Sequence, residues 1–363
     1  MKILQTNKSD FNQIRLIDVP VPAVNEGEIA VSIERFSFTA NNITYAVAGD
    51  FLRYWSFFPA QDEQGNDVSA QWGQIPVWGF ARVTESRNPD ISVGERFFGY
   101  YPPTSVAVMA PTSVRHGTFV DGAAHRSKLP AGYNLYRQAP AESDPLADNE
   151  QSMLYPLFAT AYSILDLCKE KAWFNSDQVL VLSASSKTSI GVAYAMNTQG
   201  DCPKSIGLTS KRNEKAISEL NLYDEVLSYN DVAKLNQDVS TCMIDMSGNK
   251  KLLAELHRHF GDNMFCTLSV GATHWNELNK IDGLIDERTH QFFAPSQIES
   301  MITRMGPQQF QLESGKFISE SCLKTRDWLS CQELSSLEEL VNVYPEVCQG
   351  TLDANTGIMV VLN

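Results

Sequence analysis

The chain has 363 residues, of which 43% are hydrophobic and 20% charged, a globular composition with enough apolar residues for about two domains. Its 29 lysines and arginines are outnumbered by 43 aspartates and glutamates, which gives a net charge of −14. This acidity argues against nucleic-acid binding, which requires a clustered basic surface. No run approaches the ~18 apolar residues of a membrane span, and the first residues lack the apolar segment of a secretory signal. We therefore expect a cytoplasmic protein that does not bind membranes.

The seven cysteines are scattered from position 168 onward and include no C-x-x-C pair. This spacing fits neither a disulfide framework nor a zinc ribbon, so we expect reduced thiols.

The first 150 residues have the pattern of short strands separated by Gly and Pro. Alternating apolar residues predict strands over 28–38 and 75–86, and a third strand that follows a turn at Gly94 and stops at Pro102-Pro103, which favours a small barrel or sandwich. The polar, acidic stretch 141–150 is predicted to be a connector.

From about residue 153 the pattern changes to alternating helices and strands. Helical periodicity over 154–173 precedes the apolar run QVLVL (178–182), and strand–helix units then repeat up to about residue 271. Such alternation predicts an α/β fold with a doubly wound parallel sheet.

The turn after the first of these strands, SASSKTSIG (183–191), is a candidate diphosphate site. Ligands of such sheets lie beyond the carboxyl ends of the strands, where a helix N-terminus attracts phosphate. The usual glycines are mostly serines here, and their hydroxyls can donate to phosphate oxygens. The candidate residues of the turn are Ser183, Ser185, Ser186, Lys187, Thr188 and Ser189. Two alternatives remain: an ordinary serine-capped helix, and a phosphate loop ending in SKT that has lost its glycines.

The end of the second strand carries Thr209, Ser210, Lys211 and Arg212, with no carboxylate before Glu214. NAD-binding sheets usually place an acidic residue there to hold the ribose hydroxyls, whereas cations and hydroxyls suit a 2′-phosphate. This predicts NADP(H) rather than NAD(H). The alternative is a solvated Lys-Arg pair that opens a surface helix.

Several segments together resemble the medium-chain dehydrogenase/reductase superfamily, particularly its zinc-independent quinone oxidoreductase and enoyl reductase branches. These segments are VPVPAVNEGEIAVSIERFSFTANNITYAVAG, IPVWGFARVTE, SVGERFFGYYP, YPLFATAYSIL, QVLVLSASSKTSIG, CTLSVGATHW and GTLDANTGIMVVL. The resemblance implies a GroES-like catalytic domain over 1–152, to which 300–363 returns. It also implies a Rossmann-type dinucleotide-binding domain over 153–299 and a homodimer. The sequence is most similar to a divergent bacterial subgroup.

The zinc ligands of the superfamily are missing. The corresponding regions are FSFTANN and WGFAR, which contain neither Cys nor His. The resemblance therefore implies direct hydride transfer from NADPH to an activated C=C bond or a quinone, without a metal.

The resemblance also points to residues of the site. Asn41, Tyr45 and Tyr54 are candidate catalytic hydrogen-bond donors to a small-molecule substrate, with Tyr100 and Tyr101 as further candidates. Thr160 matches a position that faces the nicotinamide, and Ser269 and Gly271 follow a later strand of the cofactor domain. Each tyrosine has the alternative role of a packed ring with a satisfied hydroxyl. An alternative function is a non-catalytic scaffold that binds a small ligand or a protein.

Overall fold

The computed structural model describes residues 1–270 and 282–362, and the chain divides into two units. The first comprises Met1–Pro156 with Arg326–Asn363, and the second comprises Leu157–Thr325. Among the described residues, no helix has the length and apolar character needed to cross a bilayer.

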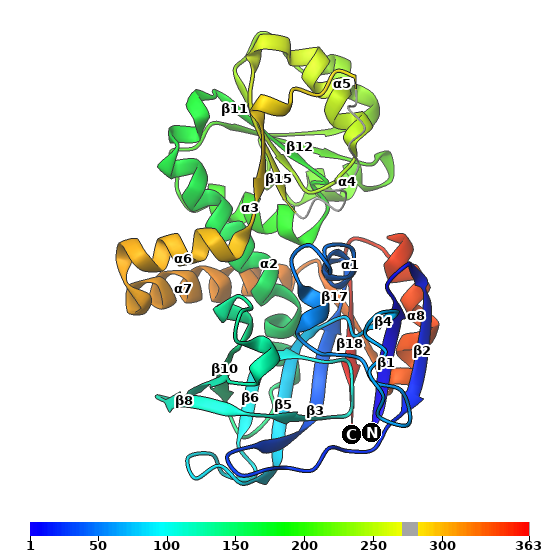
Figure 1. The fold of residues 1–363 in the computed structure, drawn as a ribbon. Helices are drawn as coiled ribbons and strands as arrows, with labels where there is room; N and C mark the ends of the chain where they lie inside the picture. Colours follow the sequence, from blue (N-terminus) through cyan, green and yellow to red (C-terminus); the bar gives the residue numbers. More distant parts are fainter. Residues whose placement is uncertain (271–281, 363) are drawn as a thin grey trace. The chain divides into compact units, whose positions relative to one another are not determined.

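The second unit contains a six-stranded parallel sheet (Figure 1). Its strands, in spatial order, are β13 (Glu225–Ser228), β12 (Lys204–Thr209), β11 (Gln178–Leu182), β14 (Thr241–Asp245), β15 (Met264–Val270) and β16 (Thr289–Phe292). Counted from β11 in chain order, this arrangement is 3-2-1-4-5-6, and the order reverses between β11 and β14. The prediction of a doubly wound parallel sheet is confirmed.

The helices that alternate with these strands are α3 (Lys187–Asn197), α4 (Lys211–Glu219) and α5 (Lys250–Phe260). Gly191 lets α3 pack closely against the helix that carries Phe158 and Ala161. A Cβ atom on Gly191 would lie 2.7 Å from the Phe158 ring and 3.0 Å from the Ala161 methyl group. Glycine at this position is therefore required by packing against the helix that carries Phe158 and Ala161.

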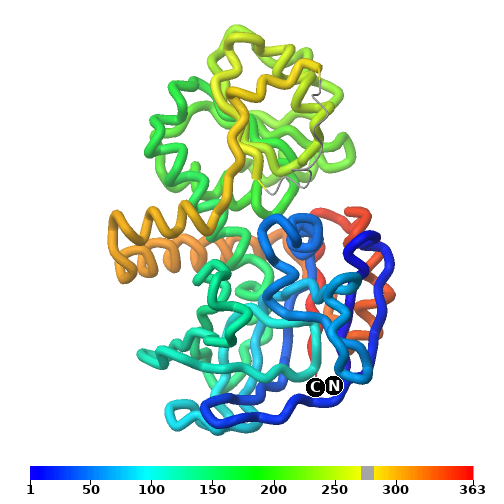
Figure 2. Tube along the Cα trace, in the orientation of Figure 1, coloured from blue at the N-terminus to red at the C-terminus, as the bar shows by residue number. Residues whose placement is uncertain are grey.

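Helices α6 (Ala294–Met305) and α7 (Pro307–Thr325) run side by side as an antiparallel pair (Figure 2). The prediction returned the chain to the first domain at residue 300, whereas the boundary lies after Thr325. Gln297 and Arg304 both bind the Asp166 carboxylate, and Tyr162 donates to Glu313 at 3.1 Å. These contacts hold the pair within the second unit.

The first unit is built on a nine-stranded, mostly antiparallel sheet and a small three-stranded one. The large sheet has the order β17 (Ser330–Leu334), β18 (Thr356–Val361), β3 (Ile29–Phe38), β5 (Val77–Ser86), β6 (Arg96–Tyr101), β10 (Leu135–Ala139), β9 (Thr118–Asp121) and β8 (Pro111–Arg115), with β7 (Val106–Met109) paired to β3. The small sheet contains β2 (Asp10–Asp18), β1 (Lys2–Asn7) and β4 (Trp72–Gly73). Helices α1 (Ala40–Val47) and α8 (Leu337–Gln349) complete this unit.

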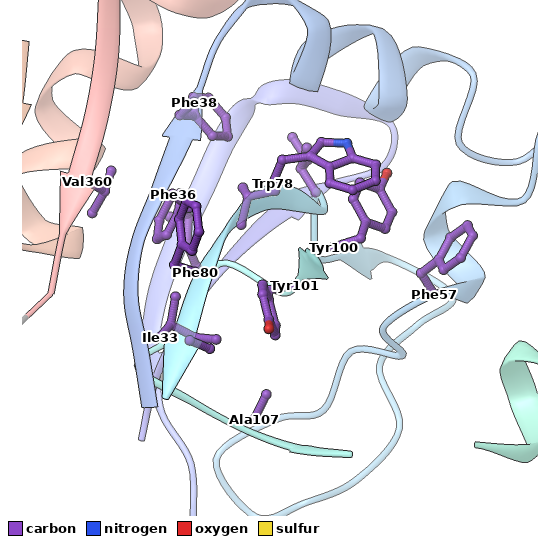
Figure 3. Packing of buried hydrophobic residues seen from close by; sticks show 14 of the residues in the cluster. Ile33, Phe36, Phe38, Phe57, Trp78, Phe80, Tyr100, Tyr101, Ala107 and Val360 are labelled. Carbon is purple, nitrogen blue, oxygen red and sulfur yellow. The ribbon is translucent and has the colours of Figure 1, made fainter. Parts of the chain in front are cut away.

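The apolar core of this unit is rich in aromatic residues from β3, β5 and β6 (Figure 3). Seven short 3₁₀ turns connect the described elements of the chain: η1 (Tyr54–Ser56), η2 (Ala124–Arg126), η3 (Ala131–Tyr133), η4 (Ala172–Asn175), η5 (Tyr229–Lys234), η6 (Gly261–Asn263) and η7 (Asp286–Arg288).

Helix α2 (Pro145–Glu170) begins inside the stretch that was predicted to be a connector. The Asp144 carboxylate accepts hydrogen bonds from the amides of Leu146 and Ala147, and Pro145 opens the helix. In the same first turn, Asp148 forms a buried bidentate pair with Arg96 at 2.6 and 3.2 Å. An Asp-Pro start is a recognised helix signal, so the connector prediction was wrong because this signal was overlooked.

Candidate functional site

Ser183, the first residue of the turn after β11, has a left-handed backbone conformation with φ of 55°. This is the conformation for which a glycine is usually needed, because a Cβ atom is strained there. At this one position the turn therefore has a backbone conformation that favours glycine while carrying a serine.

Ser186 and Ser189 have structural roles at the start of α3. Ser186 is the N-cap and accepts from the Ser189 amide at 3.2 Å, and its hydroxyl contacts the Ser189 hydroxyl at 2.9 Å. The fully buried Ser189 hydroxyl donates to the Leu182 carbonyl at 3.2 Å. The serine-cap alternative thus accounts for these two hydroxyls. Lys187 and Thr188 form the half-buried first turn of the helix.

Ser185 connects this turn to the end of the second strand. Its hydroxyl accepts from Thr209 at 3.1 Å and from the Asn213 side chain at 3.0 Å. The neighbouring Ser210 hydroxyl is buried and has no hydrogen-bond partner among the described residues, although Ser210 is the N-cap of α4. A buried unsatisfied hydroxyl is uncommon and suggests a missing polar partner.

The two predicted phosphate-binding cations lie on the exposed side of the same helix start. The Lys211 side chain is 71% exposed and pairs with Glu214 at 2.5 Å, which raises the pKa of Lys211 through that hydrogen bond. Arg212 is also exposed. Two of the predicted ribose-side groups, Thr209 and Lys211, therefore already have partners within the protein.

Two residues that the sequence analysis did not select lie at the carboxyl edge of the sheet. The Tyr229 hydroxyl accepts the Ser183 amide at 3.0 Å. Asp245 ends β14 directly opposite Leu182 of β11, and burial raises the pKa of its carboxyl group, while hydrogen bonds from Ser247 and Gly248 oppose the shift. Asp245 lies where the strand order reverses, between β11 and β14. In the sequence, the motif IDMSG places an acidic residue at the end of an apolar strand, and this pattern could have identified Asp245.

The remaining cofactor-side candidates are placed as follows. Ser269 is buried in β15, in register with Asp245, and Thr160 is half-buried in α2. Gly271 lies outside the described residues.

The catalytic candidates of the first unit belong to a group of six rings that we call the aromatic cluster: Tyr45, Tyr54, Phe57, Trp78, Tyr100 and Tyr133. Tyr45 lies on α1 and Tyr54 on η1, with ring centroids 4.7 Å apart. Trp78 and Tyr100 come from the paired strands β5 and β6 and lie together in Figure 3, with centroids 5.0 Å apart. Tyr101 points elsewhere and donates to the Phe97 carbonyl, so it is not part of the cluster.

The polar atoms of the cluster are linked to one another. Trp78 Nε1 donates to the Tyr45 hydroxyl at 3.2 Å, and the hydroxyls of Tyr54 and Tyr133 lie 3.0 Å apart. The fully buried Tyr100 hydroxyl has no partner among the described residues. Burial raises the pKa of Tyr45, Tyr54, Tyr100 and Tyr133, so all four phenols are protonated at neutral pH.

Asn41, the third catalytic candidate, lies one turn before Tyr45 at the start of α1 and is half-buried. Residues four apart lie on the same face of a helix, so Asn41 is next to Tyr45 on α1. The structure therefore brings all three sequence-predicted catalytic residues together. Trp78 and Tyr133 were missed, the latter because it lies in a loop far along the chain with no motif around it.

Within residues 1–270 and 282–362, no group of three or more His, Cys, Asp or Glu side chains is placed to hold a metal ion.

These two units, a GroES-like β-rich unit and a Rossmann-type sheet, define the fold of the medium-chain dehydrogenases/reductases, as the resemblance predicted. More particularly, the chain belongs to the family described as "Protein of unknown function (DUF2855)", whose model matches residues 36–353.

Solved structures with this fold cover nearly the whole chain at low identity. CurA from Vibrio vulnificus in complex with NADPH is 12% identical, with a TM-score of 0.59 and coverage of 96% of this chain and 94% of that one. The quinone oxidoreductase from Coxiella burnetii is 12% identical, with a TM-score of 0.57 and coverage of 100% and 99%. The CurF ER cyclopropanase of the curacin A biosynthetic pathway is also 12% identical, with a TM-score of 0.60 and coverage of 100% and 99%. No curated protein matches the chain.

Proposed function

We propose that this protein is a zinc-independent oxidoreductase that uses NADPH to reduce an activated C=C bond or a quinone. The observation that carries the proposal is Ser183, whose left-handed conformation keeps a dinucleotide-type turn at the point where strand order reverses. Structures of the same fold include an NADPH complex and a quinone oxidoreductase, which supports this class of reaction.

The residues at the carboxyl edge of the sheet fit a nicotinamide dinucleotide. The first amides of α3 suit a diphosphate, with Lys187 beside them. The unpartnered Ser210 hydroxyl, with Lys211 and Arg212, suits a ribose 2′-phosphate, because hydroxyl and cationic donors form strong hydrogen bonds to phosphate oxygens.

The aromatic cluster of the first unit contains phenols that can donate hydrogen bonds in the proposed reaction. NADPH, when bound, supplies the hydride. Tyr45 and Tyr54 keep their protons because burial raises the pKa of both phenols, so they are suited to donate hydrogen bonds to a substrate oxygen that gains negative charge. The flat apolar rings around them suit a conjugated substrate.

The first test is a titration with NADPH and NADH, followed by protein fluorescence, and a screen of quinones, enones and enoyl thioesters for NADPH consumption. The double variant Lys211→Ala/Arg212→Ala should bind NADPH at least about tenfold more weakly, because each lost charge-assisted contact is worth about 1.5 kcal/mol or more. NADH binding should not change. Lys215→Ala is the matched control, since Lys215 is an 88% exposed lysine of the same helix. Equal weakening of both cofactors would contradict the assignment of the 2′-phosphate site.

A second test concerns Lys187. If it lies beside the diphosphate, Lys187→Ala should weaken NADPH and NADH by a similar factor, because both cofactors share that group. A loss confined to NADPH would place Lys187 elsewhere.

The scaffold alternative has one observation in its favour. Tyr229 already accepts the Ser183 amide, and Ser185 is tied to Thr209 and Asn213, so part of the turn is satisfied without a ligand. Failure of both cofactors to bind at millimolar concentration would favour this alternative.

We also propose that the protein is a homodimer, as the fold resemblance implied. Strand β16 is the outer strand at its end of the second-unit sheet, and its central residues His290 and Gln291 are exposed. Light scattering on the purified chain tests this: the monomer mass of 40.5 kDa would reject it.

A further inference from the structure

Arg137 belongs to a row of four side chains that crosses the large sheet of the first unit. Arg35 of β3 lies opposite Phe80 of β5. Phe80 in turn lies opposite Phe98 of β6, and Phe98 lies opposite Arg137 of β10. Residues directly opposite each other in antiparallel strands point to the same face of a sheet. The two arginines and the two phenylalanines therefore share one face.

Helix α2 contacts both arginines of this row, but in different ways. The Arg35 guanidinium donates to the Asn149 side chain at 2.7 Å and lies 3.8 Å from the Glu333 carboxylate. Arg137 instead meets a ring, because its guanidinium lies 5.2 Å from the ring centroid of Tyr155. Arg137 Nη1 is buried and has no hydrogen-bond partner in the part of the chain that the structure describes.

The missing acceptor leaves Arg137 incompletely satisfied. A guanidinium keeps its charge in proteins, and a buried N–H group of a charged side chain is destabilising when it lacks an acceptor. The face of an aromatic ring attracts the cation but does not replace that hydrogen bond. Since Arg137 is half-buried rather than enclosed, a ligand can approach it from solvent and supply the acceptor.

The surroundings of Arg137 indicate what kind of ligand would fit. The Tyr155 ring centroid lies 5.6 Å from Trp78 of the aromatic cluster and 5.3 Å from Phe98. Trp78 donates to the candidate catalytic residue Tyr45, so two rings connect Arg137 to that phenol. A planar guanidinium beside flat rings suits a conjugated molecule with an acid group. One cation balances one negative charge, which favours a carboxylate over a phosphate with nearly two charges.

From this geometry we infer that Arg137 binds a carboxylate of the substrate, so the conjugated compound that the protein reduces is an acid. The inference rests on the proposed reductase function and names its substrate class. Arg137 would determine binding and specificity, while the phenols of the aromatic cluster meet the carbonyl group. It takes no part in the transfer of hydride.

The first test is titration calorimetry of the full chain, without cofactor, with cinnamate and with its neutral amide, cinnamamide. The wild type should bind cinnamate at least about tenfold more tightly than cinnamamide. Arg137→Met keeps an unbranched side chain but removes the charge, and it should bind the two compounds equally. Arg115→Met is the matched control, since Arg115 is an exposed arginine of β8 in the same sheet. It should keep the preference for cinnamate within about twofold.

The second test compares turnover of 3-benzoylacrylate, an enone that carries a carboxylate, with turnover of its methyl ester, with NADPH as the reductant. The wild type should have a kcat/KM at least about tenfold higher for the acid. Arg137→Met should raise the KM for the acid about tenfold and leave kcat and KM for the ester within about twofold. Equal losses for acid and ester, with a lower unfolding temperature, would make Arg137 a packing partner of Tyr155 and overturn the inference.

The outcomes separate this inference from the proposed function. If the wild type does not prefer cinnamate to cinnamamide, or if Arg137→Met keeps that preference, the inference fails even where neutral quinones are reduced. If cinnamate binding depends on Arg137 but no substrate is reduced, the carboxylate site is supported and the proposed reductase function fails.

Discussion

Ser183 carries backbone strain at the first position of the turn after β11. A residue with a Cβ atom pays about 1 kcal/mol or more for a left-handed conformation, and the surrounding structure must hold it there. The Ser183 amide is held by Tyr229, and its carbonyl accepts the Ser186 amide at 2.7 Å. Such strain is often retained at functional sites.

We predict that Ser183→Gly increases the free energy of unfolding by up to about 1 kcal/mol, because glycine removes the strain, an effect partly offset by its greater freedom in the unfolded chain. Urea unfolding would measure the change. Ser183→Ala is the matched control, since alanine keeps the Cβ atom and should give no gain. Equal stabilisation by glycine and alanine would show that the backbone at this position is relaxed.

At the scale of single residues, the sequence predicts where the serine turn lies, but it does not predict which hydrogen-bond partner each hydroxyl has. The spacing placed Ser183 to Ser189 between a strand and a helix, as observed. That Ser189 points inward to Leu182 while Ser210 is left without a partner depends on packing that no local pattern encodes.

Among the elements, α5 is joined to β15 by a buried histidine. His257 Nδ1 accepts the Ile285 amide at 2.9 Å, and Nε2 lies 2.9 Å from the Thr267 hydroxyl. Because Nδ1 accepts, the ring is neutral, and its proton is on Nε2. Burial, with a smaller contribution from Arg288, lowers the pKa of His257 from 6.5 to about 4.

This histidine predicts acid sensitivity of the second unit. The unfolded chain binds a proton at His257 near pH 6.5, while the folded chain does so only near pH 4. The folded state should therefore lose up to about 3 kcal/mol of stability as the pH falls through this window. Urea unfolding at pH 7, 6, 5 and 4 would measure the slope. His257→Gln should flatten it, whereas His259→Gln on the same helix should not; an unchanged slope in His257→Gln would assign the acid sensitivity to other groups.

Elements were more predictable than their ends and contacts. Strict alternation of apolar strands with amphipathic helices defined the parallel sheet, since few topologies accommodate it. The second half of α6 and the whole of α7 were assigned to the wrong unit because nothing local shows that Arg304 binds Asp166, more than a hundred residues earlier. Tyr133 joined the aromatic cluster through tertiary folding alone.

For the whole molecule, the chain order of the two units has a thermodynamic consequence. The first unit is assembled from both ends of the chain, and the second, Leu157–Thr325, is inserted between them. Each has its own apolar core, so heating can produce two transitions rather than one. A ligand that binds one unit stabilises that unit by mass action.

We predict that NADPH raises the unfolding temperature of the second unit alone. At a concentration about 100 times its Kd, the cofactor adds about 2.7 kcal/mol to the stability of the unit that binds it. Calorimetry with and without NADPH would show the shift, and the acid-sensitive transition, which His257→Gln relieves, would identify the second unit. NADH at the same multiple of its own Kd is the control and should move the same transition. A shift confined to the other transition would move the cofactor to the first unit. That result would remove the basis for assigning the turn at Ser183 to a dinucleotide.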